Sequence, residues 1–187
     1  DAPDSVLPEK LFQFVNKERF FDFWALEIIT GHIDGYAANQ NNFYVYSDPS
    51  DGDKVVFLPW GIDRYTSKSI EKFVYAEIPR RLSRIESMRV DLTSTLIDIL
   101  DNRFDVDALW RRVESRLSDA TPLSVDELKK QAEVYDWLTS RTSVIKDTIL
   151  ENKDFEGKKN SQACESVRTV RLVAGLVGGF LGLVIIS

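Results

Sequence analysis

The longest regular pattern of apolar positions lies between Lys17 and Gly31. Phe20, Trp24 and Ile28 repeat at intervals of four residues, and each is followed by a second apolar residue. This spacing places them on one face of an α-helix, and so wide a face is typical of a helix at the centre of a core. Gly31 follows the pattern and is a suitable residue to end the helix.

Two short segments after this helix have the composition of β-strands. Residues 43–46 and 54–58 are rich in aromatic and β-branched side chains, which fit the pleated surface of a sheet. The segment between them, Ser-Asp-Pro-Ser-Asp-Gly-Asp, consists of residues that form turns. We therefore expect a β-hairpin at about 43–58, with a loop of several residues.

The remaining pattern is mainly helical. After an initial loop, Pro8 is expected to open a short helix, because proline suits the first turn. Residues 67–73 are compatible with either helix or loop. Leu92, Leu96 and Leu100 mark one face of a further helix.

Two capping signals predict the last helices. Asp105 is the expected N-cap of one helix, and Ser124 with Glu127 forms a capping box that opens a long helix to about Glu151. The apolar residues expected to point inward from the helix after Asp105 are Val106, Leu109, Trp110, Val113 and Leu117. The fold class is therefore α+β, mostly helical, with one hairpin inserted early.

Composition narrows the class of protein. The chain has 187 residues, 43% of them hydrophobic, which suffices for one core and not for two large domains. The net charge is −6 and the basic residues are scattered, so no nucleic-acid groove is expected. Cys164 is the single cysteine, which excludes an intrachain disulfide and a zinc site built on cysteines. The chain starts at Asp1 without a methionine, and we interpret it as a fragment of a longer protein.

The C-terminal part has a different character. We expect a folded domain over residues 1–152 and, over 153–187, a polar linker followed by an apolar tail. Residues 172–186 contain no charge, which suggests a truncated membrane segment, although a full span needs about twenty apolar residues. Gly175 and Gly179 have the spacing that suits helix packing in lipid. A buried strand is the alternative interpretation of this run.

Candidate chemistry is concentrated around the hairpin. His32, Asp34 and Asn39 spell H-x-D-x-x-x-x-N, and Asp63 follows the second strand. In protein kinases a catalytic-loop Asp holds the substrate hydroxyl, and an Asn and a second Asp hold the metal. A hairpin between the two acids would bring Asp34 and Asp63 to one metal–nucleotide site, and carboxylate and amide oxygens suit Mg²⁺.

Several structural interpretations compete with this one. Asp and Asn are common loop residues, His32 is expected to be a hydrogen-bonded structural histidine, and Trp60 is expected to lie in the core. A further alternative is Ca²⁺ binding by the hairpin turn. Its ligands would be Asp48, Asp51 and Asp53, although their spacing lacks the pattern of a calcium hand.

A longer stretch of the sequence resembles the CotH family, the spore-coat and secreted kinases with an atypical protein-kinase-like fold. The similar stretch is FWALEIITGHIDGYAANQNNFYVYSDPSDGDKVVFLPWGIDRYTS. It contains a helix, a glycine-x-x-aspartate segment, Asn42 directly before an aromatic strand, an S-D-P turn and a P-W-x-x-D end. A looser likeness continues through residues 77–117 and stops before the tail.

The resemblance implies roles for individual residues. Asp34 resembles the catalytic-loop aspartate and Asp63 the metal-binding aspartate, with ATP and Mg²⁺ or Mn²⁺ as cofactors. The asparagine ligand is left open between Asn39, which has the kinase spacing, and Asn42, which directly precedes the strand. Many members carry Asp where this chain has Gly61, and that loss of a carboxylate weakens the expected metal affinity.

The resemblance also bears on the whole protein. Nothing before Asp34 resembles a strand-rich N-terminal kinase lobe, so the chain is expected to be the C-terminal lobe and nearly inactive alone. The full-length parent is then expected to phosphorylate Ser or Thr of a protein substrate. The alternative is a catalytically inactive coat-assembly or adhesion protein on the same scaffold. The family suggests an extracytoplasmic, cell-surface or spore-coat location, with a cytoplasmic one still open, and membrane contact through residues 172–186 is a further expectation.

Overall fold

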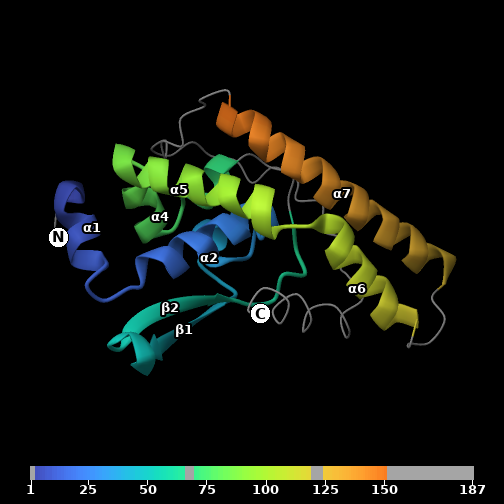
Figure 1. Cartoon of the computed structure of the whole chain (residues 1–187), viewed down its shortest axis with the longest axis horizontal. Helices are drawn as coiled ribbons and strands as arrows, with labels where there is room; N and C mark the ends of the chain where they lie inside the picture. Colours follow the sequence, from blue (N-terminus) through green and yellow to red (C-terminus); the bar gives the residue numbers. More distant parts are fainter. Residues whose placement is uncertain (1–2, 66–69, 119–123, 151–187) are drawn as a thin grey trace.

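The computed structural model describes residues 3–65, 70–118 and 124–150. Long helices surround a central one, and a single two-stranded antiparallel sheet lies at one side (Figure 1). The α+β, mostly helical class expected from the sequence is confirmed at this level. The elements in chain order are η1 Asp4–Val6, α1 Leu7–Leu11, α2 Lys17–Ile29, α3 Tyr36–Asn39, β1 Phe43–Asp48, η2 Pro49–Asp51, β2 Lys54–Pro59, η3 Ile70–Phe73, α4 Glu77–Leu82, α5 Glu86–Asp98, the π-helical turn η4 Ile99–Arg103, α6 Val106–Ser118 and α7 Val125–Leu150.

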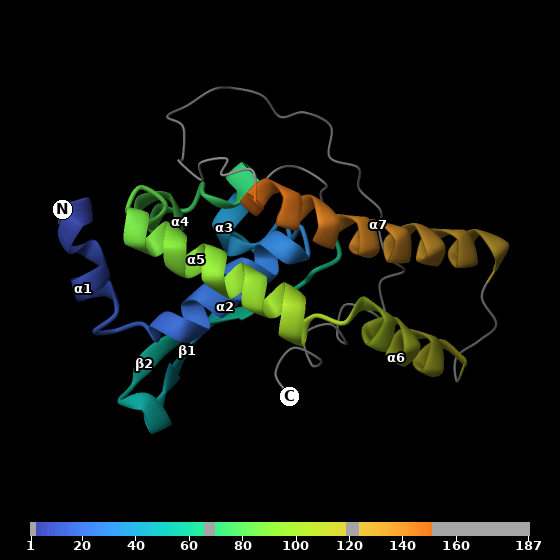
Figure 2. The same cartoon turned by 45° about the horizontal axis from the view of Figure 1, so that its top comes forward.

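Helix α2 is the central element of the core, as its pattern predicts. Its N-cap Asn16 accepts a hydrogen bond from the backbone N–H of Arg19 at 2.9 Å, and the chain leaves the helix through Gly31, whose φ is +59°. Trp24 is fully buried, and its indole N–H donates to the carbonyl of Phe73 at 2.7 Å. Helices α5 and α7 and strand β2 all contact α2; Figure 2 shows α5 running across it.

The hairpin forms where the sequence predicts it. Strand β1 pairs with β2 from Phe43↔Pro59 to Asp48↔Lys54, and the turn closes through Gly52 at φ +61°. Val56 and Phe57 of β2 are buried against the core. Tyr44, Val45 and Tyr46 of β1 remain exposed, and β1 contacts the core through Phe43, whose ring centroid lies 4.8 Å from that of Tyr36.

The two predicted caps of the last helices are confirmed. The carboxylate of Asp105 accepts from the backbone N–H of Ala108 at 2.8 Å. Ser124 and Glu127 form the reciprocal bonds of a capping box, with the Ser124 N–H donating to the Glu127 carboxylate at 2.8 Å and the Glu127 N–H donating to the Ser124 hydroxyl at 3.3 Å. The residues expected to point inward from α6 are only half-buried, because α6 lies at the periphery with α7 (Figure 2).

One expectation about the core is wrong. Trp60 is 52% exposed, and its ring lies edge-on to the exposed ring of Tyr44, with centroids 5.4 Å apart. The indole lies on the outer side of the hairpin. The hydrophobic character of a side chain is therefore not enough to predict that it is buried. The tail over residues 153–187 lies outside the described residues. Within the described residues, no helix is long and apolar enough to cross a bilayer.

Candidate functional site

The segment that carries Asp34 is held in place by a carboxylate from the preceding helix. Glu27 of α2 is 1% exposed and accepts from the backbone N–H groups of Tyr36 and Ala37, at 2.8 and 2.7 Å. These N–H groups begin the short helix α3, where a helix has unpaired donors. Glu27 therefore fixes the position of the turn between α2 and α3, which contains Asp34.

Glycine at position 35 is required by this arrangement. A Cβ atom there would lie 2.3 Å from Oε1 of Glu27 and 2.7 Å from Nδ1 of His32. Neither neighbour can move easily, because both side chains are fully buried. The close approach of the backbone to Glu27 therefore excludes any side chain at Gly35.

Burial opposes the charge on Glu27. Loss of solvent raises the pKa of Glu27 to about 8, although the two backbone hydrogen bonds from Ala37 and Tyr36 act in the opposite direction. The carboxyl is thus mainly protonated at neutral pH and loses its proton as the pH rises through 8. Sequence reasoning missed Glu27, since a single acidic residue in an amphipathic helix normally marks the solvent side.

Both oxygens of Asp34 are occupied by hydrogen-bond donors of the protein. Asn39 donates its amide N–H to Oδ1 at 3.0 Å, and Arg64 donates from Nη1 to Oδ2 at 2.9 Å. The Asp34 side chain is 13% exposed and that of Arg64 is 41% exposed. Asp34 and Asn39 are thus in direct contact, and the arrangement adds Arg64, which the motif did not indicate.

The segment after β2 returns to the same place. His32 and Tyr65 form an isolated antiparallel bridge, which holds residues 61–65 against the Asp34 segment. Gly61 has φ +61°, and the Asn42 side-chain amide lies against it, with its N–H 3.5 Å from the Gly61 carbonyl. Asn42 and Asp63 are therefore carried by segments in direct contact.

His32, the first residue of the motif, is buried in the segment that carries Asp34. The ring is fully buried, and this burial lowers the pKa of His32 to about 4, while contact with the Gly61 backbone and the negative charges of Asp34 and Asp63 act to raise it. Nδ1 lies 3.8 Å from Oε1 of Glu27, and neither ring nitrogen has a hydrogen-bond partner within the described residues. His32 is thus a buried, neutral residue, which fits the structural role expected for it.

The donor set around Asp63 fits a weakly held Mg²⁺ or Mn²⁺. Within the described residues, the Asp63 carboxylate makes no hydrogen bond or ion pair, and Asn42 uses only its amide nitrogen. No three acidic, histidine or cysteine side chains gather into a metal cluster in this part of the chain. A metal here would be held by one carboxylate, an amide oxygen and several waters, which Mg²⁺ tolerates.

The two candidate asparagines differ in their surroundings. Asn39 is exposed at the end of α3 and donates to Asp34, whereas Asn42 is half-buried against Gly61. Asn42 adopts φ +23°, which is rare for a side-chain-bearing residue and is often found at functional sites. The structure favours Asn42 as the residue facing the Asp63 segment, and Asn39 as a partner of Asp34.

The hairpin turn does not support a calcium site. Asp48 accepts from Ser50 and from Arg19, and Asp51 accepts from Asn16 at 2.6 Å. These acids hold the turn and attach it to the start of α2, so their oxygens already have partners.

Comparison with known proteins gives a partial likeness to one CotH protein. No protein-family model matches the chain. A stretch of 55 residues is 42% identical to the protein named Invasin CotH2 from Rhizopus delemar, and the match covers 29% of this chain and 9% of that protein. The likeness therefore covers less than a third of this chain and a small part of a longer relative. This likeness supports a CotH-like relationship and nothing finer.

Proposed function

We propose that the protein containing this chain is an atypical, metal-dependent protein kinase, to which the chain contributes the catalytic-loop aspartate and the metal-binding segment. The observation that carries the proposal is that the segment after β2, which contains Asp63, lies against the Asp34 segment: His32 and Tyr65 form an antiparallel bridge, and Arg64 pairs with Asp34. The hairpin separates these acids by almost thirty residues in sequence and returns the second to the first. Phosphoryl transfer needs this juxtaposition of an acid for the hydroxyl and an acid for the metal.

Each residue then has a defined role. Asp34 would accept the hydrogen of a Ser or Thr hydroxyl of the protein substrate and orient its oxygen. Asp63 and Asn42 would hold Mg²⁺ or Mn²⁺, which neutralises the charge of the ATP phosphates, with Asn39 keeping Asp34 in position. Arg64 donates to the Asp34 carboxylate, and the substrate hydroxyl would use one of the acceptor positions that remain on its oxygens.

Location and partners follow from the same relationship. The relative is named an invasin, which fits a protein that acts at a surface, and we extend this location to the present chain. A cell-surface or coat protein with this site would phosphorylate neighbouring proteins of that surface.

An inactive surface or coat protein on the same fold is the second candidate. Two observations favour it: Arg64 already neutralises Asp34 at 2.9 Å, and Gly61 stands where many CotH-like chains have a further aspartate. A site retained only for structure would keep the Asp34–Arg64 ion pair as a link between the two segments.

The test uses the natural full-length protein that includes this sequence. It is incubated with γ-labelled ATP, Mg²⁺ or Mn²⁺ and a general protein substrate, beside Asp34→Asn and Asp63→Ala. We expect each substitution to lower the transfer rate by about a hundredfold or more. The matched control Asp91→Asn, which removes a surface ion pair with Lys17, should leave it unchanged. Nucleotide binding without transfer by the wild-type protein would favour the inactive scaffold.

A further inference from the structure

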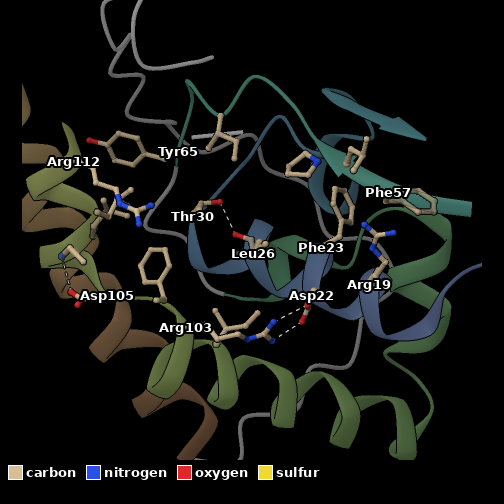
Figure 3. Close-up of a pocket in the computed structure, with 18 of the residues that line it drawn as sticks. Arg19, Asp22, Phe23, Leu26, Thr30, Phe57, Tyr65, Arg103, Asp105 and Arg112 are labelled. Carbon is tan, nitrogen blue, oxygen red and sulfur yellow. Dashed lines mark hydrogen bonds and ion pairs between the residues drawn. The ribbon is translucent and has the colours of Figure 1, made fainter. Parts of the chain in front are cut away.

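A second site lies behind the segment that carries Asp63. A cavity of about 620 Å³ opens between α2, β2, η4, α6 and α7, and Figure 3 shows residues from these elements facing one hollow. Its volume is in the range of pockets that bind small molecules, about 300–1,000 Å³. Neither Asp34 nor Asp63 lines it, whereas Ile62 and Tyr65 do.

The walls of the cavity are mainly apolar. Phe23 and Leu26 of α2 face Phe57 of β2, and Trp137 and Leu138 of α7 complete the lining. Trp137 packs on Tyr65 with ring centroids 4.2 Å apart, and its indole nitrogen is buried without a hydrogen-bond partner in the described part of the chain. The cavity therefore combines apolar surface with an unused donor.

The charges around the cavity leave one cation uncompensated. Arg19 is paired with Asp48 at 2.9 Å, and Arg103 makes two bonds to Asp22 at 2.9 and 2.7 Å. The remaining acid, Asp105, is used as the N-cap of α6. Two of the three arginines that line the cavity are therefore paired with a carboxylate.

The third arginine, Arg112, lacks such a partner. No carboxylate pairs with it within the described residues, and in Figure 3 its guanidinium extends from α6 toward Thr30 and Tyr65 across the hollow. A guanidinium fork matches a carboxylate in geometry and charge. The cavity thus offers apolar walls and a single recognition group for an anion.

We propose that this cavity binds an organic carboxylate with an elongated apolar body, whose carboxylate is recognised by Arg112. The apolar part lies against α2, β2 and α7, where its burial supplies most of the affinity. The head group stays near the cavity mouth, where Arg112 is exposed. This site is separate from the proposed phosphoryl-transfer site, so its test does not depend on kinase activity.

The experiment measures binding of dodecanoate to the full chain by isothermal titration calorimetry, below the micelle concentration of the ligand. The neutral analogue dodecanol is the probe for apolar contact alone. We expect saturable one-to-one binding of dodecanoate, and Arg112→Gln should weaken it by about tenfold, the effect of one charge-assisted hydrogen bond at a partly exposed site. Binding of dodecanol should be weaker and insensitive to this substitution.

Two variants locate the site. Arg111→Gln removes the neighbouring exposed arginine of the same helix, which does not line the cavity, and should leave binding unchanged. Ala108→Trp places an indole in the hollow from α6 and should abolish binding of both probes, with circular dichroism confirming that the chain is folded.

The proposal is overturned by absence of saturable binding, by equal affinities for dodecanoate and dodecanol, or by equal effects of Arg111→Gln and Arg112→Gln. Sedimentation is measured alongside. A dimer that dissociates with Ala108→Trp, and that does not bind dodecanoate, would instead assign the cavity to contact between copies and would equally overturn the proposal.

Discussion

At the scale of a single residue, the contacts that Asp34 makes in the structure compete with the contacts that catalysis would require of it. As a catalytic acid it must receive a hydroxyl, but Arg64 and Asn39 satisfy both of its oxygens. The ion pair is half in solvent, so its contribution to stability is small. Its effect on chemistry is larger, because a fixed positive charge beside Asp34 repels any cation bound near Asp63.

Arg64→Gln should therefore strengthen metal binding. We expect the affinity for Mn²⁺ to rise about three- to tenfold, as the removal of one partly screened charge predicts, with little change in stability. Electron paramagnetic resonance of free Mn²⁺ during titration measures this affinity without any assay of activity.

Arg80→Gln is the matched control for this prediction. Arg80 is similarly exposed and forms an ion pair with Glu77 on α4, so its loss changes the net charge equally. An equal gain in Mn²⁺ affinity in both variants would show that only the net charge matters and that Arg64 has no special position.

Glu27 leads to a second prediction at the scale of a single residue, which concerns the dependence of folding stability on pH. Burial raises the pKa of Glu27 to about 8, so between pH 4.5 and 8 the folded state binds more protons than the unfolded chain. Its contribution to stability is complete below about pH 4.5 and is lost as pH rises to 8. The buried His32, with its pKa lowered to about 4, opposes this trend only below about pH 6.5, where the unfolded imidazole gains a proton.

The net expectation is a loss of stability between pH 6.5 and 8. The free energy of unfolding should fall by on the order of 2 kcal/mol over this range. Urea unfolding at each pH measures it. In Glu27→Gln this slope should disappear, whatever the absolute stability of the variant. A slope that persists in Glu27→Gln would mean that Glu27 is not the group that titrates.

At the scale of an element, the turn from α2 into α3 depends on Gly35. A Cβ at this position collides with the buried Glu27 carboxylate, and the same carboxylate holds the first N–H groups of α3. Gly35→Ala should cost about 3 kcal/mol, as overpacking at a buried site does. Urea unfolding measures this cost.

Gly52→Ala is the comparison that separates crowding from backbone strain. Gly52 has φ +61° with nothing near its missing Cβ, so alanine there meets only the left-handed penalty of about 1 kcal/mol. Equal costs for the two variants would contradict the role assigned to Glu27 at Gly35.

Elements with a strong local signal were predictable from the sequence. The four-residue repeat of α2, the turn residues of the hairpin and the capping boxes each act within a few residues, and the structure confirms them. The sequence also placed Asp34 and Asn39 in one short segment, and in the structure Asn39 donates to Asp34.

Contacts between distant residues were not predictable. Arg64 meets Asp34 across the hairpin, thirty positions away, and no local pattern marks an arginine as the partner of a chosen acid. The exposure of Trp60 was missed because one face of the two-stranded hairpin is not covered by the body and leaves apolar side chains in solvent. The roles of Asp34, Asn39, Asn42 and Asp63 in catalysis and metal binding stay predictions.

At the scale of the whole molecule, one buried cation joins helix α7 to the core. Arg141 of α7 is 3% exposed, and its Nη2 donates to the Ile28 carbonyl at 3.0 Å, at the negative end of the α2 dipole. Burial lowers the pKa of Arg141 to about 10, so the cation persists at neutral pH. One turn further along α7, Ile145 is buried as well.

Arg141→Ala should release α7 from the body, because it both removes the hydrogen bond to the Ile28 carbonyl and leaves a cavity. We expect a loss of about 2–3 kcal/mol and faster hydrogen exchange in residues 137–149, with exchange in α2 and β2 affected less. Arg141→Met is the matched variant, since it restores packing without the charge and should recover more than half of the loss. Equal losses in the two variants would show that the hydrogen bond, and not the filled space, attaches α7 to the core.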